Sequence, residues 1–517
     1  MPPKGSFYTQ WQSAHARRAW LTPVNILLGT MLVGGALMVL QLSLLNGKSS
    51  RFVQDEYAQA LIEEDGEVYP EMVLQSKWAT PIPRSDRLHI ALLHEACLTH
   101  KDAVITSAYG ANGKVTPTST RAGLIQRDDP DLLEKIRQCV DVDIFLPLGI
   151  RGHGYCEDSV GYTKYLESRM LPAWAIEMTY TDKKTGKSYS YHELCPKTPM
   201  IFLNHYWDGI PDKPEWPAAK PKYLMPNIEM QELDASHYWN VDAVLCKTAI
   251  CARRVRAWYE QEGNPKNTVV FYTRHTTSDI AELARERMGM AAIQPKNFSD
   301  VRFIHAAGSS MQKGTKHVVE CFLSRSDLPR IDIYISQNVF DDAVKRFYEK
   351  EVEREKHRIV FHMERVDTNG FAKLTAENAF FMCTSFQEGY GHYINQARAT
   401  GAVIITTDLP PMNELLTPES GVLVPVSRWI MDGQFLGGKY RGNHGLEGVQ
   451  GMTAAIHADN ICAAVDRVVA MTAAQRQALG DRAKLQYAID TNFFSAKMEE
   501  VRAYARGPQR LFRTPAP

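Results

Sequence analysis

The sequence lacks an excess of charge of either sign, because 59 Lys and Arg residues balance 59 Asp and Glu residues among 517. A chain without a basic excess carries no electrostatic footprint for nucleic acid, so we expect no nucleic-acid partner. The composition is 44% hydrophobic and 23% charged, which is enough apolar material for sizeable cores. The length indicates about two to four domains.

The nine cysteines form no CxxC pair and show no zinc-ligand spacing, so we expect no cysteine-based metal site. The count is odd, which means that at least one cysteine is unpaired or joins two chains. Several lie in apolar runs, as Cys383 does in AFFMCTS, and are interpreted as buried thiols. A disulfide between Cys156 and Cys195 is an alternative if the chain enters an oxidising lumen.

Residues 19–47 contain no charged side chain, and their centre reads VNILLGTMLVGGALMVLQLSLL. A helix of this length crosses a hydrocarbon core of about 30 Å. The run exceeds the apolar region of a cleaved signal peptide, so we predict a transmembrane signal anchor. The tail at 1–18 has basic residues and no acid, which places it in the cytosol. We expect a single-pass type II membrane protein of the Golgi or endoplasmic reticulum with a lumenal catalytic domain.

Short continuous apolar runs follow a polar, acidic stem at 48–85. They are LHIALLHEA from Leu88, VDIFLPLG from Val142, PMIFLNHYW from Pro199, PKYLMPN from Pro221, VDAVLCK from Val241 and TVVFYT from Thr268. Such runs are typical of strands in a parallel sheet that is covered on both faces. The segment TYTDKKTGKSYSYHEL from Thr179 alternates around a Lys-Thr-Gly turn, which predicts an inserted β-hairpin.

A second series of apolar runs begins after about residue 298. It comprises RFIHAAG from Arg302, RIDIYIS from Arg330, HRIVFHM from His357, NAFFMCTS from Asn378, GAVIITT from Gly401 and GVLVPV from Gly421. Strand–helix alternation in two blocks predicts an α/β protein with two Rossmann-like, doubly wound domains, at 86–297 and 298–495, facing a cleft. Residues 496–517 are expected to be a C-terminal tail. Ligands of such sheets bind at the carboxyl ends of the strands.

One stretch after a predicted strand combines several features of a ligand site: EGYGHYINQARATGAVIITTDLPPMNE, from Glu388. The glycines at 389 and 391 let the backbone turn sharply and approach a ligand closely. A helix predicted from about His392 to Thr400 offers unbonded N–H groups and a partial positive charge. Glu388 can accept hydrogen bonds from two adjacent hydroxyls, and Gln396 falls inside the helix. This chemistry suits a sugar, although a glycine turn beside a solvated glutamate explains the spacing equally well.

The same stretch resembles the donor-binding signature of retaining glycosyltransferases with the GT-B fold, in particular glycosyltransferase family four (glycosyl transferases group 1). That signature is Glu-Gly-Phe-Gly, a helix with a second Glu, a Gly, a strand, and then Pro and Glu. RFIHAAGSSMQKGTKHVVECF is similar to the first strand and Lys-Gly loop of the family's nucleotide-binding domain. The resemblance covers roughly residues 298 to 495, while the first half matches in layout only.

The resemblance implies an acceptor domain, a nucleotide-sugar-binding domain and transfer of a sugar with retention. It implies that Glu388 binds donor hydroxyls, that Lys313 neutralises the diphosphate and that position 396 holds the ribose. The donor-binding residues are then Gly308, Ser309, Lys313, Ser385, Glu388, Gly389, Tyr390, Gly391, Gln396 and Glu414. Glu414 matches a carboxylate whose role is more often structural. No metal or cofactor is expected beyond the nucleotide sugar, because a lysine, helix N-termini and amides stabilise the leaving diphosphate.

Two positions depart from the family pattern. Gln396 stands where a second Glu is usual, and Ser309 stands where an Arg is usual. Gln still hydrogen-bonds a ribose, but without charge. The main hypothesis is a membrane-anchored glycosyltransferase. These changes motivate a second one, a non-catalytic member that binds a sugar or nucleotide, and a nucleotide-sugar epimerase is a third.

The acceptor side is less determined by the sequence. We place His205, which follows the strand-like IFLN, among the catalytic candidates with Glu388 and Lys313, although a histidine here is more often structural. Glu229 lies where loops of the first domain can meet the cleft. The expected acceptor is a glycan, a glycolipid or a glycoprotein.

Overall fold

A computed structural model of the chain describes residues 78–152, 154–229, 232–430, 436–438, 440–449 and 451–507. All of these belong to one compact unit, Tyr57–Pro517. The predicted membrane span at 19–47 and all but the end of the predicted stem lie outside the described residues. None of the helices in the described ranges is long and apolar enough to cross a membrane.

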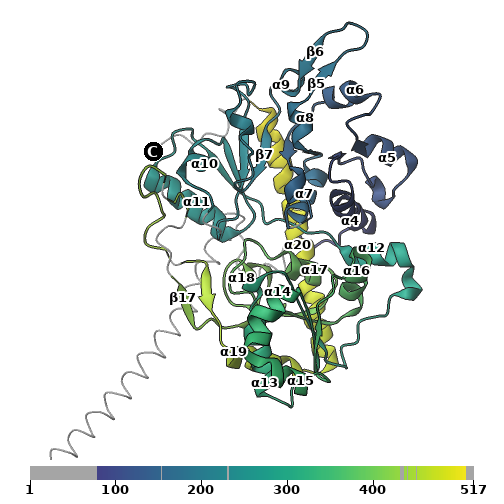
Figure 1. The fold of residues 1–517 in the computed structure, drawn as a ribbon, viewed down its shortest axis with the longest axis vertical. Coiled ribbons are helices and arrows are strands. Elements are labelled where there is room, and N and C mark those ends of the chain that lie inside the picture. The colour runs from purple at the N-terminus through teal and green to yellow at the C-terminus, as the bar shows by residue number, and fades with distance from the viewer. Residues whose placement is uncertain are drawn as a thin grey trace, which may run out of the picture. The chain divides into compact units, whose positions relative to one another are not determined.

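The first half of the unit is built on an eight-stranded sheet (Figure 1). In spatial order its strands are β10 (Val269–Tyr272), β9 (Ala243–Cys246), β8 (Lys222–Met225), β7 (Met200–Leu203), β3 (Asp143–Phe145), β4 (Arg169–Leu171), β1 (Val104–Thr106) and β2 (Leu124–Ile125). The run from β10 to β4 is parallel, whereas β1 and β2 extend it antiparallel at one edge. The predicted hairpin is present as β5 (Thr179–Thr181) and β6 (Ser188–Ser190).

The second half is built on a six-stranded sheet that is parallel throughout. In spatial order its strands are β13 (Ile359–His362), β12 (Ile331–Ile335), β11 (Phe303–Gly308), β14 (Phe380–Cys383), β15 (Val403–Thr407) and β16 (Val422–Val424). A separate two-stranded ribbon pairs β17 (Arg428–Ile430) with β18 (Thr453–Ala455). The two sheets confirm the α/β class.

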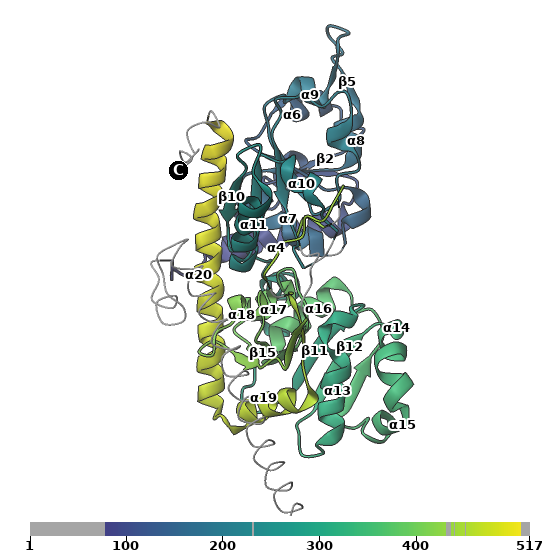
Figure 2. The ribbon, with the colours of Figure 1, turned by 90° about the vertical axis from the view of Figure 1, so that its left-hand side faces the viewer.

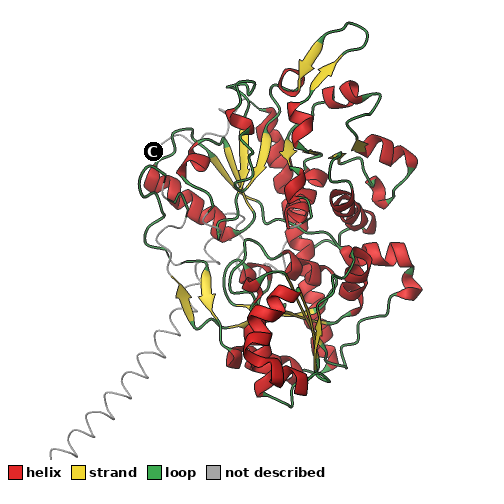
Figure 3. Ribbon diagram, in the orientation of Figure 1, coloured by secondary structure: helices red, strands yellow, loops and turns green. Residues whose placement is uncertain are grey.

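Helices flank the two sheets (Figure 3). In the first half they are α4 (Arg84–Thr99), α5 (Pro117–Gly123), α6 (Leu132–Arg137), α7 (Gly154–Tyr165), α8 (Ala173–Glu177), α9 (Tyr191–Leu194), α10 (Ala235–Trp239), α11 (Ala249–Glu262) and α12 (Ile280–Met288). They continue as α13 (Thr315–Ser324), α14 (Gln337–Phe340), α15 (Arg346–Arg354), α16 (Thr368–Glu377), α17 (His392–Ala399), α18 (Met412–Leu415), α19 (Ala458–Ala470) and α20 (Ala473–Arg506).

Strand β14 is apolar at every position because both faces of the second sheet are covered. Along β14, Phe380 and Met382 pack in one hydrophobic cluster with residues of α13 and α19. The intervening Phe381 and Cys383 pack in a different cluster with residues of α17 and α18. Since successive side chains point to opposite faces of a sheet, these clusters lie on its two sides. Continuous apolar runs therefore predicted these strands correctly.

The run LHIALLHEA, predicted as a strand, is instead part of the 16-residue helix α4. Leu88, Leu92, Leu93, Ala96 and Cys97 are all buried in this helix. The apolar positions continue at the i, i+4 and i+3 spacing of one helical face beyond the length of an ordinary strand. The prediction was wrong because a short apolar run looks the same in a buried helix and a buried strand.

Helix α20 belongs to both halves of the unit (Figure 2). Its N-terminal part contributes Leu479 to the core of the second sheet. Its C-terminal part contributes Met498, Val501 and Tyr504 to the core of the first. Residues 496–506, expected to lie in a tail, are the last turns of α20, and Met498, Val501 and Tyr504 among them are buried. The other expected domain boundaries stay predictions.

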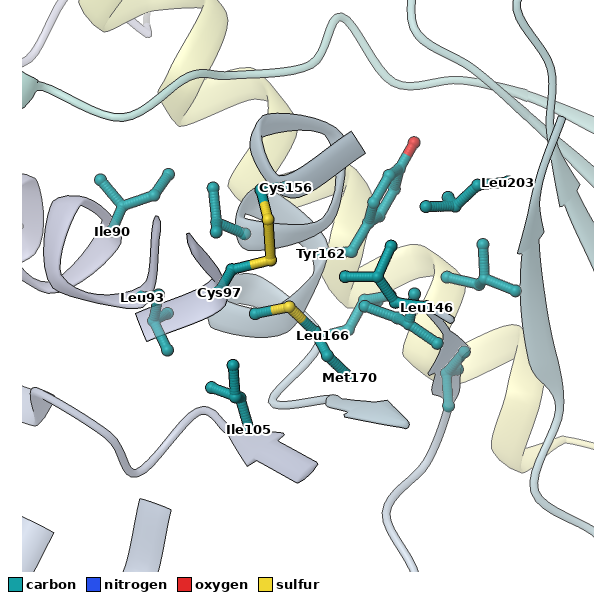
Figure 4. Close-up of a cluster of buried hydrophobic side chains, with 14 of the residues drawn as sticks. Ile90, Leu93, Cys97, Ile105, Leu146, Cys156, Tyr162, Leu166, Met170 and Leu203 are labelled. Atoms are coloured by element: carbon teal, nitrogen blue, oxygen red, sulfur yellow. A yellow bond between two sulfur atoms is a disulfide. The ribbon is translucent and has the colours of Figure 1, made fainter. Parts of the chain in front are cut away.

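Disulfides pair most of the cysteines. The four bonds are Cys97–Cys156, Cys139–Cys195, Cys246–Cys251 and Cys321–Cys462, and Cys383 is a buried free thiol. The alternative pairing of Cys156 with Cys195 was wrong, because each has a nearer partner. Figure 4 shows the Cys97–Cys156 bond tying α4 to α7 within the largest apolar cluster of the first half.

Candidate functional site

The predicted donor residues lie at the point where the strand order of the second sheet reverses. From β11 the chain proceeds outward through β12 to β13, and then returns to place β14 on the other side of β11. Such a reversal leaves a crevice outside the carboxyl ends of the two central strands. Gly308 ends β11, and Ser385 and Glu388 follow β14. The two segments that the resemblance singled out therefore meet at one edge of the sheet.

Lys313 and Glu388 form an ion pair across this edge. The Ser385 hydroxyl donates to Glu388 Oε1 at 2.6 Å and lies 2.6 Å from the Tyr393 hydroxyl. The Lys313 ammonium lies 3.8 Å from the centroid of the Tyr393 ring. The Lys313 and Glu388 side chains keep 17% and 13% of their surface exposed. The structure thus places a cation, a carboxylate and a hydroxyl together, partly open to solvent.

Two glycines make this arrangement possible. Gly314 has φ of 73°, and a Cβ there would come within 2.3 Å of the Thr384 carbonyl oxygen, so only glycine lets the Lys313 loop lie against β14. Gly391 has φ of 103° and accepts hydrogen bonds from the amides of Ile394 and Asn395, which opens α17. The first amides of α17 point back toward the Glu388 loop.

Gly389 and Tyr390 contact the first half of the unit directly. A Cβ at Gly389 would lie 2.4 Å from Glu229 Oε1, so the Glu229 carboxyl packs on the Gly389 backbone. Gln387 Nε2 also donates to the Glu229 carbonyl oxygen at 2.7 Å. Tyr390 is buried and its hydroxyl donates to the His275 carbonyl oxygen at 2.9 Å. The side chain of Tyr390 is therefore an anchor between the halves.

Glu229 is an unusual carboxyl group at this contact. Burial raises its pKa, the Lys247 ammonium lowers it, and the carboxylates of Glu388 and Asp158 raise it further, to about 7. Its Oε2 atom is buried and forms no hydrogen bond with the described residues. Glu229 therefore carries its proton for much of the range below neutral pH.

Gln396 is turned into the first half of the unit. Its side-chain amide donates to Glu157 Oε1 at 2.8 Å, and both residues are buried. Glu157 also accepts from the Ser278 amide at 2.9 Å. The amide that was expected to hold a ribose is thus engaged by a carboxylate of α7. Ser309, at the other departure from the family pattern, is exposed next to Gly308.

Glu414 joins α18 to the start of α11. Its two carboxylate oxygens accept from the amides of Ala249 at 2.7 Å and Ile250 at 2.9 Å. These amides belong to the first turn of α11 and have no acceptor within the helix, so a negative charge is favourable there. Burial raises the pKa of Glu414 to about 7, against the lowering effect of the two amides. These contacts fit the structural role noted for this position, and its place among the donor-binding residues stays a prediction.

A buried polar network at the same contact was missed by the sequence analysis. Asp158 Oδ1 accepts from Lys247 Nζ at 2.5 Å and lies 2.8 Å from His392 Nε2. Burial raises the pKa of Asp158, but the charge of Lys247 and the bond with His392 outweigh burial and hold it below the usual range. His275 is fully buried beside them, and burial keeps its pKa well below the usual value. The only sequence signals were a lysine directly after an apolar strand and two neighbouring acids near the start of a helix.

The network also bears on metal binding. Among the described residues, ligand atoms of Asp158, His275 and His392 lie within 4.8 Å of one another. The Lys247 ammonium bonds the same Asp158 oxygen, so that carboxylate already has a cationic partner. A cavity of about 10 Å³ lies beside them, lined by Lys247, Tyr272, His275 and Glu414 among others, and its volume suits one water molecule.

His205 lies at the corresponding reversal of the first sheet. From β3 the chain crosses through α7 to β4 on one side, whereas β7 pairs with β3 on the other. His205 follows β7, and its Nδ1 atom pairs with the Glu232 carboxylate. Asn204 Nδ2 donates to the same carboxylate at 2.6 Å. The structure therefore gives His205 a carboxylate partner that the sequence analysis did not identify.

No known family model matches the sequence, and no curated protein matches it. Among solved structures, the chain is similar to a sucrose-phosphate synthase from Thermosynechococcus elongatus, at 14% identity over 65% of this chain and 82% of that chain, with a TM-score of 0.42. It is also similar to an α,α-trehalose 6-phosphate synthase from Burkholderia multivorans, at 11% identity over 75% and 79%, with a TM-score of 0.43. A third similar structure is HepE from Anabaena in complex with UDP and glucose, at 16% identity over 55% and 72%, with a TM-score of 0.36. At these TM-scores the likeness establishes neither the fold nor the activity of this chain. The fold is given by the two sheets, and the site is the basis for an activity.

Proposed function

We propose that this chain is a glycosyltransferase that moves a sugar from a nucleotide-sugar donor to a glycan, lipid or protein acceptor. The observation that carries the proposal is the meeting of Lys313, Ser385, Glu388 and the Gly389–Gly391 amides at the strand-order reversal of the second sheet. A cation, backbone amides and a helix N-terminus suit a diphosphate, and a carboxylate beside a hydroxyl suits sugar hydroxyls. Each of these groups has a defined task in the transfer.

In the reaction the bond between the anomeric carbon and the diphosphate oxygen breaks, and the electron pair leaves with the diphosphate. The Lys313 ammonium and the first amides of α17 stabilise that charge, while Glu388 holds hydroxyls of the transferred sugar. Lys313 exchanges its bond with Glu388 for bonds with the donor. The proposal needs no metal or organic cofactor, so activity is expected to persist in EDTA. Retention of anomeric configuration is the outcome that the resemblance implies.

We also propose that residues 19–47 anchor the chain in the membrane and that the catalytic unit lies in the lumen of the Golgi or endoplasmic reticulum. The four disulfides support it, because such bonds persist in oxidising compartments and are rare in the cytosol. In sealed microsomes that express the full chain, protease added outside is expected to spare the catalytic unit until detergent opens the vesicles. Digestion without detergent would contradict the lumenal placement.

The activity is tested by nucleotide release from a panel of UDP-, GDP- and ADP-sugars. Release from one class of donor, with about a hundredfold loss in both Lys313→Ala and Glu388→Ala, is the expected result. Lys316→Ala is the matched control, since Lys316 is a partly exposed lysine of the adjacent helix that pairs with Glu320 at 3.9 Å. Equal activity in all four proteins would remove Lys313 and Glu388 from the mechanism.

A non-catalytic member of the same fold is the second candidate, because the Gln396 amide is already bound to Glu157. That candidate predicts nucleotide binding, measured by calorimetry, without release from any donor in the presence of a broad acceptor panel. Turnover with any donor excludes it.

A further inference from the structure

One tripeptide of the sequence has no part in the proposed transfer. Asn297, Phe298 and Ser299 form a sequon of the type Asn-X-Ser, at which the amide of an asparagine accepts a glycan in secreted and lumenal proteins. No other Asn-X-Ser or Asn-X-Thr tripeptide occurs in the 517 residues. A glycan is bulky and strongly hydrated, so the folded chain has to leave its asparagine in solvent.

The sequon lies in the segment 293–302, between the short 3₁₀ helix η4 (Met290–Ala292) and strand β11. Figure 1 shows α12 beside α16, and Ile293 belongs to the small apolar cluster that these two helices form. The Gln294 amide donates to Glu377 Oε1 at 3.0 Å, at the last residue of α16. The segment is therefore attached to the fold directly before the sequon.

The two neighbours of the asparagine contact the interior of the fold. Lys296 and Phe298 are both partly buried. Lys296 Nζ donates to the Thr375 carbonyl oxygen at 2.9 Å. The Phe298 ring meets the Phe380 ring edge to face with centroids 6.2 Å apart, and the Phe298 carbonyl oxygen accepts from Arg476 Nη1 at 3.0 Å. These contacts fix the backbone on both sides of the asparagine.

The two residues that define the sequon lie on the solvent side of this segment. Asn297 and Ser299 are both exposed. Asn297 Oδ1 accepts from the Ser299 amide at 2.9 Å and from the Asp300 amide at 3.4 Å. These bonds use the oxygen of the side-chain amide, while its Nδ2 atom donates to none of the described residues. The nitrogen that would carry a glycan is thus accessible and unengaged within the described part of the chain.

We propose that Asn297 is an N-glycosylation site and that it carries a glycan in the mature protein. The inference goes beyond the proposed transfer and rests on the lumenal placement of the catalytic unit. The donor is an oligosaccharide bound to a lipid diphosphate. One Nδ2–H bond breaks, and the nitrogen forms a bond to the anomeric carbon. The bond from that carbon to the diphosphate oxygen breaks, its electron pair leaves with the lipid diphosphate, and the released proton balances the added charge.

The modification is compatible with the hydrogen bonds of the folded segment. The substituted amide keeps Oδ1 as an acceptor, so the bonds from the Ser299 and Asp300 amides persist. Neither neighbour has to leave its inward contacts, because the glycan is attached to an exposed atom. The fold therefore accepts the glycan without repacking.

The test is electrophoresis of the full chain, expressed in a eukaryotic host, before and after treatment with peptide N-glycosidase. One upward shift that the glycosidase removes is expected for the unaltered chain and for Ser299→Thr, which keeps the hydroxyl. No shift is expected for Asn297→Gln or for Ser299→Ala, which keeps the asparagine. Mass spectrometry after glycan removal in heavy-oxygen water is expected to find the label at residue 297 alone.

A matched control uses the exposed turn of the hairpin β5–β6. Lys183, Lys184 and Thr185 are all exposed there, and Lys183→Asn creates a sequon over 183–185. Added to Asn297→Gln, this change is expected to restore the shift. A shift in that double variant without one in the unaltered chain would overturn Asn297 as the modified residue. No shift in either protein would overturn the proposal together with the lumenal placement.

Nucleotide release distinguishes this proposal from the proposed function. Asn297→Gln is expected to keep the donor turnover of the unaltered chain, because Asn297 contacts none of the donor-binding residues. A glycosidase-sensitive shift without turnover of any donor would support the modification and overturn the proposed function. Turnover of a donor by an unaltered chain that shows no shift would do the reverse.

Discussion

At the scale of single residues, the contact between Gln396 and Glu157 explains why this chain departs from the family pattern. The two side chains meet at 2.8 Å in a buried position, where one is a carboxylate and the other an uncharged donor. A second carboxylate at 396 would face the first without a proton between them, which is unfavourable in a buried site. The carboxylate that the family pattern places at position 396 of α17 is thus supplied by Glu157 of α7.

The substitution Gln396→Glu is expected to destabilise the fold by about 2–4 kcal/mol at neutral pH, because it opposes two buried carboxylates. The double variant Gln396→Glu with Glu157→Gln restores the donor–acceptor pair with its polarity reversed. We expect the double variant to recover most of the stability that Gln396→Glu loses, as measured by the thermal midpoint. A double variant no more stable than Gln396→Glu alone would contradict direct coupling between the two positions.

Glu229 makes stability depend on pH. Its pKa is raised from 4.5 to about 7 in the folded chain, so between these values the folded state binds more protons than the unfolded state. Stability therefore falls as the pH rises through this window, by roughly 1–3 kcal/mol, and is unaffected by this group below it. Glu229→Gln removes the contribution. Thermal midpoints at pH 5 and pH 8 are expected to differ less in Glu229→Gln than in the unaltered chain, and equal differences would exclude Glu229 as a source of the pH dependence.

At the scale of elements, α20 packs in the cores of both halves. The sequence analysis predicted no segment with this role. Leu479 lies in the second core, and Met498, Val501 and Tyr504 lie in the first. A helix of 34 residues is about 50 Å long, which is enough to reach both sheets.

The substitution Met498→Ala is expected to cost about 2–5 kcal/mol, because it opens a cavity in the first core at a residue with no exposed surface. Glu500→Ala, two positions along the same helix at a side chain that is 57% exposed, is expected to change stability by less than about 0.5 kcal/mol. Both are measured as thermal midpoints. Similar small effects at the two positions would show that the end of α20 behaves as a tail.

At the scale of the whole molecule, the disulfides define the chemical state in which the chain folds. Cys97–Cys156 ties α4 to α7, and Cys321–Cys462 ties α13 to α19, so each sheet has a covalent bond between two of its covering helices. Closing loops of this length stabilises a fold mainly by restricting the unfolded chain.

The disulfide pattern predicts a thiol count. Under denaturing conditions, the oxidised full-length chain is expected to show one reactive thiol, that of Cys383, and nine after reduction. Cys97→Ser is expected to expose a second thiol and to cost about 2–5 kcal/mol. Nine thiols in chain purified from its native compartment would show that the bonds do not form there, and would weaken the lumenal placement with them.

The sequence by itself determined what depends on neighbouring residues. The buried strands β7, β9 and β14 followed from continuous apolar runs, and the start of α17 followed from two glycines after Glu388, because these patterns act over a few residues. The family resemblance implied that Lys313 and Glu388 both bind the donor, and the structure shows that they form an ion pair.

Only the tertiary structure decided what depends on distant residues. Glu157 and Gln396 are 239 positions apart, Asp158 and His392 are 234 apart, and no local pattern relates them. The cysteine pairing, the helical state of α4 and the Glu232 partner of His205 were fixed in the same way. In each case several local alternatives have similar free energies, and the packing of segments that are distant in the sequence selects among them.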